Sequence, residues 1–282
     1  MTVSTAPVPL TTKAPATTKT VAAKNRFWSW VIYTVGALYF LVPLAATFYW
    51  SLRAERGVFG FEAYRRLFAD TDFLPAFSES IVNAFAAIFL SLLFIVPTAY
   101  WVTLRLPKLR PVIEFITLLP FVIPAVVLVF GLIRLYSRPP LLMTATYESS
   151  RVLLVCVYAA LSFPYMFRAV DNGLRAMDVR ALTEAAQSLG AGWPTILLRV
   201  IFPNLRVALL SGALLTFAIV IGELTIALYM AQHTLGPYMA DLTRSKVYEP
   251  SAMAIVAFAI TWAAMGIIQL VGRGQQGQMA GR

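Results

Sequence analysis

The sequence contains very few of the residues from which disulfides, haem sites and metal centres are built. Cys156 is the only cysteine and His233 the only histidine among 282 residues. A disulfide within the chain needs two cysteines, and bis-His haem ligation or a His-rich metal site needs more than one histidine. The Walker A pattern G-x-x-x-x-G-K-[ST] is also missing, which removes this type of ATP site. We therefore expect no enzyme activity and no cofactor in this chain.

Charged residues are scarce as well. They make up 13% of the chain, whereas hydrophobic residues make up 59% and the mean hydropathy is +0.74. A soluble domain carries about twice this share of charge. The apolar runs are long enough for helices of about 20 residues to cross a bilayer, and a membrane barrel would show short alternating segments instead. The composition predicts an all-α polytopic membrane protein.

Six hydrophobic stretches are predicted to be transmembrane helices, and several begin or end in aromatic residues, as interfacial anchors do. They cover residues 28–50, 77–104, 112–136, 152–170, 207–230 and 252–271. Residues 25–274 would form one six-helix membrane domain. Residues 1–24, rich in Thr, Ala, Pro and Lys, are expected to be a disordered cytoplasmic tail. Residues 275–282 would form a second cytoplasmic tail.

The positions of the charges predict which side each loop faces. With the N-terminus inside, fourteen of the 23 basic residues and four acidic residues lie inside, a net charge of +10. Nine basic and eight acidic residues lie outside, a net charge of +1. The short loop 105–110 carries only basic charges, the pattern that the positive-inside rule weights most. Both termini and the loop 171–206 are therefore expected to be cytoplasmic, and the basic excess does not indicate nucleic-acid binding.

The loop 171–206 contains the most informative motif. The letters E-A-A at 184–186 are followed by three residues, then by Gly190, nine further residues and V-I-F-P at 200–203. The proline of the last segment is expected to interrupt a second short helix before the next apolar span. An ordinary amphipathic helix-turn-helix between two spans is the plain alternative to a functional motif.

Simple physical chemistry accounts for a helical hairpin at this place. Leu182, Ala186 and Leu189 are spaced i, i+4, i+7, which places them on one face of a short helix. Gly190 follows the last turn and suits a helix end that needs a positive φ. Trp193-Pro194 would begin the second helix, with proline near its first position. The small alanines would let another surface approach closely.

The spacing closely resembles the EAA loop of binding-protein-dependent ABC importer permeases, whose usual ending is Ile-x-Leu-Pro. The resemblance implies the type I ABC importer permease fold with six transmembrane helices, in the bacterial cytoplasmic (inner) membrane. It implies three kinds of partner: an ATPase subunit dimer that binds the ATP, a second permease subunit, and a periplasmic or surface substrate-binding protein. The loop of such a permease sits in a groove of the ATPase. The resemblance assigns this coupling role to Glu184, Ala185, Ala186, Leu189, Gly190 and Pro203.

Glu223 is the only acidic residue well inside a predicted span. A carboxylate in hydrocarbon is costly, so it should face protein or water. It would either contact a transported amine or form a hydrogen bond between helices or subunits. The G-E pair and the T-L-G-P segment at 234–237 look like the fifth-span region of permeases for polyamines, iron(III) and phosphonates. A polyamine or similar small organic solute is the first expectation, and iron(III), phosphonate or another small anion is the alternative. An ion-coupled carrier and a membrane enzyme are weaker rivals.

Four further residues are candidates for the substrate pathway. Pro120 and Pro124 lie four residues apart in the third span, where they can open a broken turn or simply support packing. Asn83 near the start of the second span would line the pore or cap a helix. Tyr165 would line a cavity or act as packing and an interfacial anchor. Outside the membrane, the charged segment 64–72 is a candidate docking site for a binding protein or an ordinary solvated helix.

Overall fold

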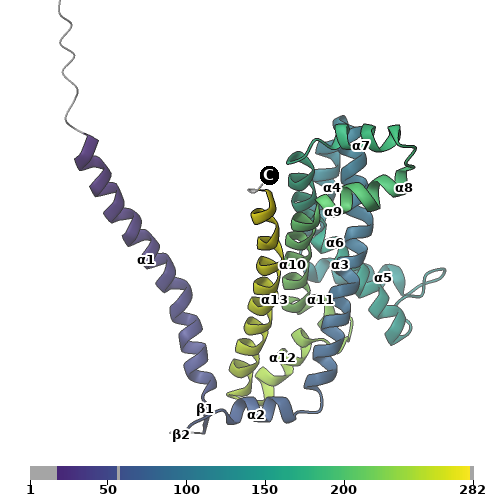
Figure 1. Cartoon of the computed structure of the whole chain (residues 1–282). Helices are drawn as coiled ribbons and strands as arrows, with labels where there is room; N and C mark the ends of the chain where they lie inside the picture. Colours follow the sequence, from purple (N-terminus) through teal and green to yellow (C-terminus); the bar gives the residue numbers. More distant parts are fainter. Residues whose placement is uncertain (1–17, 56–57, 280–282) are drawn as a thin grey trace, which may run out of the picture. The chain divides into compact units, whose positions relative to one another are not determined.

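The computed structural model of this protein describes residues 18–55 and 58–279 (Figure 1). The chain divides into two units, residues 1–49 and 50–282. Helix α1 (Thr18–Ser51) makes up the described part of the first unit and runs two residues into the second. It begins inside the segment predicted as a tail, of which residues 1–17 lie outside the described part. Helix α13 likewise continues through most of the predicted C-terminal tail, whose residues 280–282 are not described.

The second unit is helical apart from one short antiparallel hairpin, which agrees with the predicted all-α class. Its elements in order are β1 (Arg53–Glu55), β2 (Val58–Phe59), α2 (Glu62–Ala69), α3 (Phe73–Leu104), η1 (Pro107–Leu109), α4 (Arg110–Val122), α5 (Ala125–Tyr136), α6 (Tyr147–Arg175), α7 (Val179–Ser188), α8 (Trp193–Thr195), the π-helical η2 (Ile196–Ile201), α9 (Phe202–Asn204), α10 (Arg206–Gly222), α11 (Thr225–Tyr229), α12 (Leu235–Ser245) and α13 (Glu249–Met279).

The described residues contain three helices that are long and apolar enough to cross a membrane, or up to five spans if each of two bent helix pairs counts as one. The sixth predicted span corresponds to the start of α13, whose apolar described part, Glu249–Ala264, is shorter than a full span. The predicted count of six spans is therefore not confirmed within the described residues. The third predicted span bends by 96° between α4 and α5, and the fifth ends at Gly222 instead of continuing to residue 230.

Helices α3, α6 and α10 form the centre of the second unit, where small residues let the backbones approach. The Ser91 hydroxyl of α3 lies 2.6 Å from the Ser162 hydroxyl of α6, and both serines are fully buried. On α10, a Cβ at Gly212 would come within 2.5 Å of the Met166 sulfur of α6. These small residues let α3 and α10 approach α6 closely at the two places.

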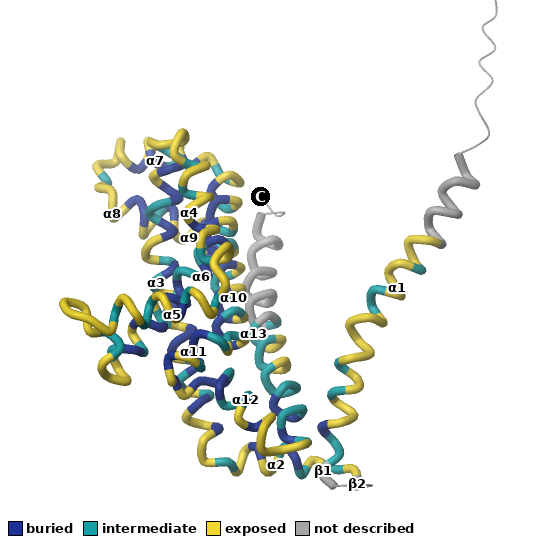
Figure 2. Tube along the Cα trace, turned by 180° about the vertical axis from the view of Figure 1, so that it is seen from behind, coloured by how far each residue is buried: buried dark blue, intermediate teal, exposed yellow. Residues whose placement is uncertain are grey.

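The buried side chains form two clusters along the bundle, visible as dark blue segments in Figure 2. One surrounds Tyr158 and joins α3 and α6 to α11, α12 and α13. The other surrounds Phe167 and joins α3 and α6 to α7, η2 and the start of α10. Figure 1 accordingly shows α7 and α8 at one end of the second unit, with α2 and α12 at the other.

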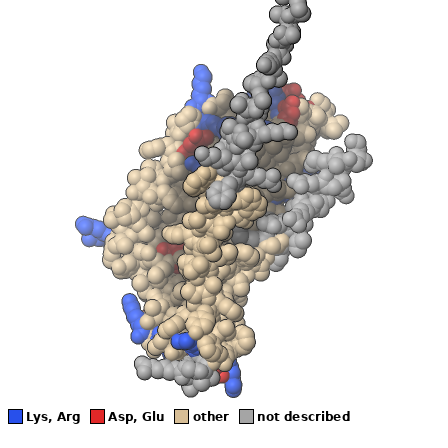
Figure 3. Space-filling model, turned by 90° about the vertical axis from the view of Figure 1, so that its left-hand side faces the viewer, with Lys and Arg blue, Asp and Glu red and all other residues tan. Residues whose placement is uncertain are grey.

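Most of the charged side chains visible in Figure 3 lie toward the two ends of the drawn face. Between the ends is a band with few charges, where a basic side chain protrudes at one edge and acidic atoms show near the centre. Such a band is expected where side chains meet hydrocarbon, because an exposed charge there is costly. The helical hairpin of residues 179–204 therefore lies at one of the two polar ends.

Candidate functional site

The first helix of the hairpin ends as its sequence predicts. Gly190 has φ = 75°, the left-handed conformation that favours glycine. The Ala191 N–H donates to the Ala186 carbonyl (3.0 Å), and the Gly190 N–H donates to the Gln187 carbonyl (2.9 Å). These two bonds form a Schellman motif, which satisfies carbonyls at the end of α7. Pro194 occupies the first turn of α8, also as predicted.

Two contacts with α3 hold the hairpin at the end of the bundle. The Tyr100 hydroxyl, fully buried on α3, lies 3.1 Å from the Thr183 hydroxyl of α7. The Trp101 ring stacks on the Trp193 ring of α8 with 6.0 Å between centroids. The sequence offered no signal for Tyr100 as an anchor, because it lies within an apolar run of a different helix.

The buried face of α7 is not the one formed by Leu182, Ala186 and Leu189. Val179, Thr183 and Ala186 are the buried residues, and they also follow the spacing i, i+4, i+7. Leu182 is half-buried and Leu189 is 88% exposed, so Leu189 is accessible on the surface of the hairpin. Thr183 can be buried because its hydroxyl donates a hydrogen bond to the Val179 carbonyl at 2.7 Å. No unsatisfied polar group is therefore buried with it.

The coupling candidates on α7 therefore form an accessible surface. Glu184, Ala185, Leu189 and Gly190 are exposed, whereas Ala186 faces inward. Glu184 also lines a polar recess of about 330 Å³ between the end of α3 and α7, together with Arg105 and Arg180 among others. The mixture of an exposed leucine with charges of both signs is the kind of surface on which a protein partner binds.

Pro203 lies on the second limb of the hairpin, in the first turn of α9. The helix pair Trp193–Asn204 and Arg206–Gly222 bends by 79° at Leu205. The predicted interruption before the next span is thus present. Since α10 begins directly after the bend, the hairpin is continuous with a central helix of the bundle.

The second candidate feature is the break in the third span. Helix α4 contains Pro120 and ends at Val122, and Pro124 lies in extended backbone (φ = −55°, ψ = 136°) before α5. Pro124 cannot donate a backbone hydrogen bond, so the helical ladder stops there. Tyr165 of α6 makes an edge-to-face contact with Phe121 of α4, with ring centroids 5.4 Å apart. Tyr165 therefore supports the helix that carries the break.

Asn83 is fully buried between α3 and α6, and it does not cap a helix. Its carbonyl oxygen accepts a hydrogen bond from Arg151 Nε at 3.0 Å. Arg151 lies 3.9 Å from the Glu79 carboxylate, which in turn accepts the Tyr147 hydroxyl at 2.5 Å. Asn83 thus belongs to a polar network that joins α3 to α6.

Glu223 lies at a helix break that the sequence analysis missed. Helix α10 ends at Gly222, and the Glu223 backbone is extended (φ = −80°, ψ = 126°). Its carboxylate oxygens accept the N–H of Ile226 (2.8 Å) and of Ala227 (3.1 Å), which are otherwise unpaired donors at the start of α11. The Tyr158 hydroxyl of α6 donates to the same carboxylate at 3.2 Å. The carboxylate thus forms the interhelical hydrogen bond that was one of the two expectations.

The T-L-G-P segment at 234–237 packs directly on this break. A Cβ on Gly236 would lie 2.3 Å from the Glu223 carbonyl oxygen and 2.9 Å from the Leu224 Cα. The Leu235 N–H donates to the Ser80 hydroxyl of α3 at 2.8 Å. Glycine at 236 is therefore required by the close approach of two backbones.

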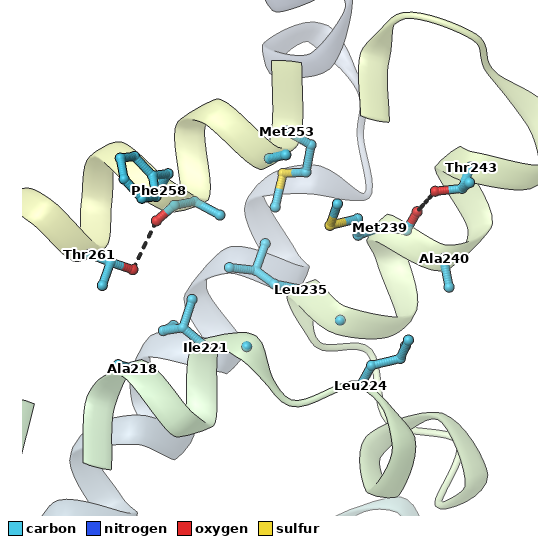
Figure 4. Close-up of a pocket in the computed structure, with 14 residues that line it drawn as sticks. Ala218, Ile221, Leu224, Leu235, Met239, Ala240, Thr243, Met253, Phe258 and Thr261 are labelled. Atoms are coloured by element: carbon cyan, nitrogen blue, oxygen red, sulfur yellow. Dashed lines mark hydrogen bonds between the residues drawn. The ribbon is translucent and has the colours of Figure 1, made fainter. Parts of the chain in front are cut away.

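An apolar cavity of about 510 Å³ opens beside the break, between α10, α12 and α13. Figure 4 shows Ile221, Leu235 and Met253 pointing into it. The Thr243 and Thr261 hydroxyls bond carbonyls of their own helices, at 2.8 and 2.9 Å. With these hydroxyls satisfied, the lining presents almost nothing to a charged or strongly polar solute.

The predicted site residues thus fall into separate places. The coupling residues lie together on the hairpin, with Ala186 turned inward and Pro203 on its second limb. Pro120, Pro124 and Tyr165 mark the α4–α5 break. Asn83 and Glu223 each form hydrogen bonds with α6, to Arg151 and Tyr158 respectively.

Several known proteins are similar to this chain, among them two curated proteins and one solved structure. A probable molybdenum ABC transporter permease protein of Haloferax volcanii is 32% identical to this chain. The aligned part covers 57% of this chain and 60% of the relative's length. A spermidine/putrescine transport system permease protein PotB homolog of Mycoplasma genitalium is 25% identical, over 78% of this chain and 80% of the relative. In the crystal structure of a bacterial alginate ABC transporter bound to an alginate pentasaccharide-bound periplasmic protein, one chain matches with a TM-score of 0.64. That match has 15% identity and covers 86% of this chain and 93% of the other, so it shows the fold.

The family model described as "binding-protein-dependent transport system inner membrane component" matches residues 95–272. This range covers well over half of the chain, including the hairpin, the Glu223 break and most of the central bundle. Together with the E-A-A, glycine and proline spacing on an exposed helical hairpin, it establishes that the chain belongs to the family of binding-protein-dependent ABC importer permeases.

Proposed function

We propose that this protein is the membrane-spanning subunit of an importer whose energy comes from a separate ATPase dimer. The observation that carries the proposal is the hairpin surface of Glu184, Ala185 and Leu189, exposed at one polar end of the bundle. This surface carries the E-A-A, glycine and proline spacing of the family, which supports a protein partner there. A second permease, a homologue or an identical copy, and a substrate-binding protein complete the assembly.

The hairpin is well connected for passing on a movement of the ATPase. Its first helix is tied to α3 through Tyr100 and Thr183, and its second limb continues into α10 past the 79° bend. ATP-driven closure of the ATPase dimer would push the hairpin and so move α3 and α10 together. The cavity between two permeases would then open alternately to the two sides. ATP binds only the ATPase, and this chain requires no cofactor.

We place the protein in the bacterial cytoplasmic (inner) membrane as a multi-pass protein. Both termini and the hairpin would face the cytoplasm, and α2 and α12 would face the outside. The charge distribution of +10 against +1 supports this orientation. Protease or tag accessibility in intact spheroplasts tests it, because cleavage within residues 1–24 from outside contradicts it.

The transported solute is proposed to be a polyamine or a similar small organic solute. The PotB homolog of Mycoplasma genitalium supports this choice because the similarity covers most of both chains. An oxyanion is the second candidate, and the Haloferax relative named for molybdenum supports it. Uptake of labelled spermidine by cells that express the importer, with competition by excess putrescine, molybdate or sulfate, separates the two. Polyamine transport predicts competition by putrescine alone.

The coupling role is tested by one substitution at two nearby glycines. Gly190→Val forces a β-branched residue into left-handed backbone, which costs about 1–2 kcal/mol or more. Gly192→Val is the matched control, because Gly192 has ordinary extended backbone (φ = −76°, ψ = 163°) and only Pro194 Cδ near its Cβ position, at 3.9 Å. Glu184→Arg reverses one charge on the exposed surface.

We expect Gly190→Val and Glu184→Arg to lower ATP-driven uptake strongly while membrane insertion is retained, and Gly192→Val to transport normally. Insertion is measured by membrane fractionation and assembly by copurification of the ATPase. Normal uptake by both coupling variants with an assembled ATPase would contradict the proposal.

A further inference from the structure

A pocket of about 650 Å³ lies at the end of the bundle opposite the hairpin, between the α2–α3 junction, the start of α6 and α12. We call it the α2–α12 pocket. Four carboxylates line it: Asp70, Asp72, Glu79 and Asp241. Lys246 is the only lysine or arginine among the described residues that line it. The pocket is therefore strongly acidic, and none of the functions above uses it.

The carboxylates are only partly neutralised by the protein. Glu79 accepts the Tyr147 hydroxyl and lies 3.9 Å from Arg151, and Asp241 lies 3.6 Å from Arg244. These two carboxylates therefore already have partners.

The other two carboxylates, those of Asp70 and Asp72, have fewer partners within the protein. Asp70 accepts the Asp72 backbone N–H at 3.0 Å, and its carboxylate also interacts with the Tyr238 hydroxyl. The Asp72 carboxylate has no hydrogen bond or ion pair within the described part of the chain and does not cap α3. At least one carboxylate at the rim is thus available to a ligand.

Buried hydroxyls in the same pocket provide an independent observation. Thr234 is 3% exposed, and its hydroxyl forms no hydrogen bond of normal geometry with the described residues. The Tyr238 hydroxyl is also buried, and it interacts with the Asp70 carboxylate without a hydrogen bond of normal geometry. Buried polar groups are nearly always satisfied, so each exception needs an explanation such as a bound ligand. Both hydroxyls line the α2–α12 pocket, which indicates that a polar group completes it.

The chemistry of the lining selects a cation. Burial, together with the carboxylates of Asp70, Asp72 and Glu249, raises the pKa of the Tyr238 phenol, so it stays protonated at physiological pH. The rings of Tyr147 and Tyr238 supply two aromatic walls. Carboxylates with aromatic rings are the combination that binds ammonium and guanidinium groups, through charge-assisted hydrogen bonds and cation–π contacts. The volume lies in the range of small-molecule sites.

We propose that the α2–α12 pocket binds a primary ammonium or guanidinium group. The group comes either from a free amine solute or from a lysine or arginine of the substrate-binding protein. The inference rests on the proposed importer function, in which this end of the bundle meets incoming solute. It adds a cation site that is distinct from Glu223, whose carboxylate is already held by α11 and Tyr158.

The first arm of the test is calorimetric titration of spermidine into the assembled importer in phosphatidylcholine nanodiscs, without ATP and without binding protein. Asp72→Asn removes a rim charge but no helix cap, and Tyr238→Phe removes a hydroxyl but keeps the ring. Glu148→Gln is the matched control, because Glu148 is exposed near the same end and does not line the pocket. For a free amine we expect Asp72→Asn to weaken spermidine binding at least tenfold, Tyr238→Phe to weaken it less, and the control to leave it unchanged.

The second arm measures how much of the copurifying binding protein is needed to stimulate the ATPase. If the pocket takes a basic side chain of that protein, Asp72→Asn raises the required concentration at least tenfold while the control does not. A tenfold loss in either arm supports the pocket and identifies the source of the cation. No change in both arms overturns the proposal. The titration needs neither ATP nor the hairpin, so its result is separate from the outcome of the coupling test.

Discussion

Replacing Glu223 should damage the helix break around it before it affects solute recognition. The wild-type carboxylate accepts two backbone N–H groups of α11 and the Tyr158 hydroxyl. A hydrogen bond to a charged group contributes about 1.5–3 kcal/mol, and a buried donor left without a partner costs about 1–3 kcal/mol. Glu223 is half-buried and its bonds are not additive, so we expect Glu223→Leu to destabilise the protein by about 3 kcal/mol.

Glu223→Gln should have a smaller effect on stability. The amide keeps one acceptor oxygen, and its NH₂ group can donate to the Tyr158 hydroxyl. In the wild type, the second carboxylate oxygen accepts the Ala227 N–H. An NH₂ group at that position cannot accept it, so this one hydrogen bond is lost. We expect a loss of about 1–2 kcal/mol from that single bond.

Thermal unfolding in detergent, followed by size-exclusion chromatography, measures both variants. At about 2–4 °C per kcal/mol for a protein of this size, the midpoint should fall by about 6–12 °C for leucine and about 2–8 °C for glutamine. Glu148→Leu, at an exposed position, should change it little. Uptake should fall in proportion to the loss of assembled complex. An inactive Glu223→Gln with an unchanged midpoint and full assembly would refute this reasoning and point to direct contact with solute.

Two further changes test the close approach of α12 and the break in the third span. Gly236→Ala places a Cβ 2.3 Å from the Glu223 carbonyl oxygen, and overpacking of this kind costs about 1–3 kcal/mol or more. Gly222→Ala, with nothing within 4 Å, should keep the wild-type unfolding midpoint, and equal midpoints for both alanine variants would contradict the packing. Pro124→Ala restores a backbone donor at the 96° bend and should reduce uptake while the complex still copurifies. Unchanged uptake would mean that the proline serves packing alone.

Local chemistry predicted the parts of the site where a single residue limits the backbone. Gly190 marked a helix end because it accepts a positive φ, and Pro124 marked a break because it lacks an N–H. These signals do not depend on distant parts of the chain. They indicated the hairpin, and they offered a broken turn in the third span as one of two interpretations beside plain packing.

Features that depend on tertiary contacts were not predicted. The apolar run continues past Glu223, so the sequence favoured one long helix, whereas the carboxylate caps a new helix and bonds to α6. Spacing alone fits two equally regular faces of α7, one with Leu182 and Leu189 and the other with Val179 and Thr183, so it does not show which face is buried. Thr183 lies on the buried face, where its hydroxyl contacts Tyr100 of α3.

The direct test of the central claim is site-specific cross-linking between the hairpin and the ATPase. With Cys156, the only cysteine, replaced by serine, Leu189→Cys introduces a single thiol at an 88% exposed position. A thiol-to-amine cross-linker should then join this permease to the ATPase subunit, and nucleotide should change the yield. Ser245→Cys, exposed on α12 at the other end of the bundle, should give no ATPase adduct. No adduct at Leu189→Cys, or an ATPase adduct at Ser245→Cys, would contradict the proposal that the hairpin couples this permease to its ATPase.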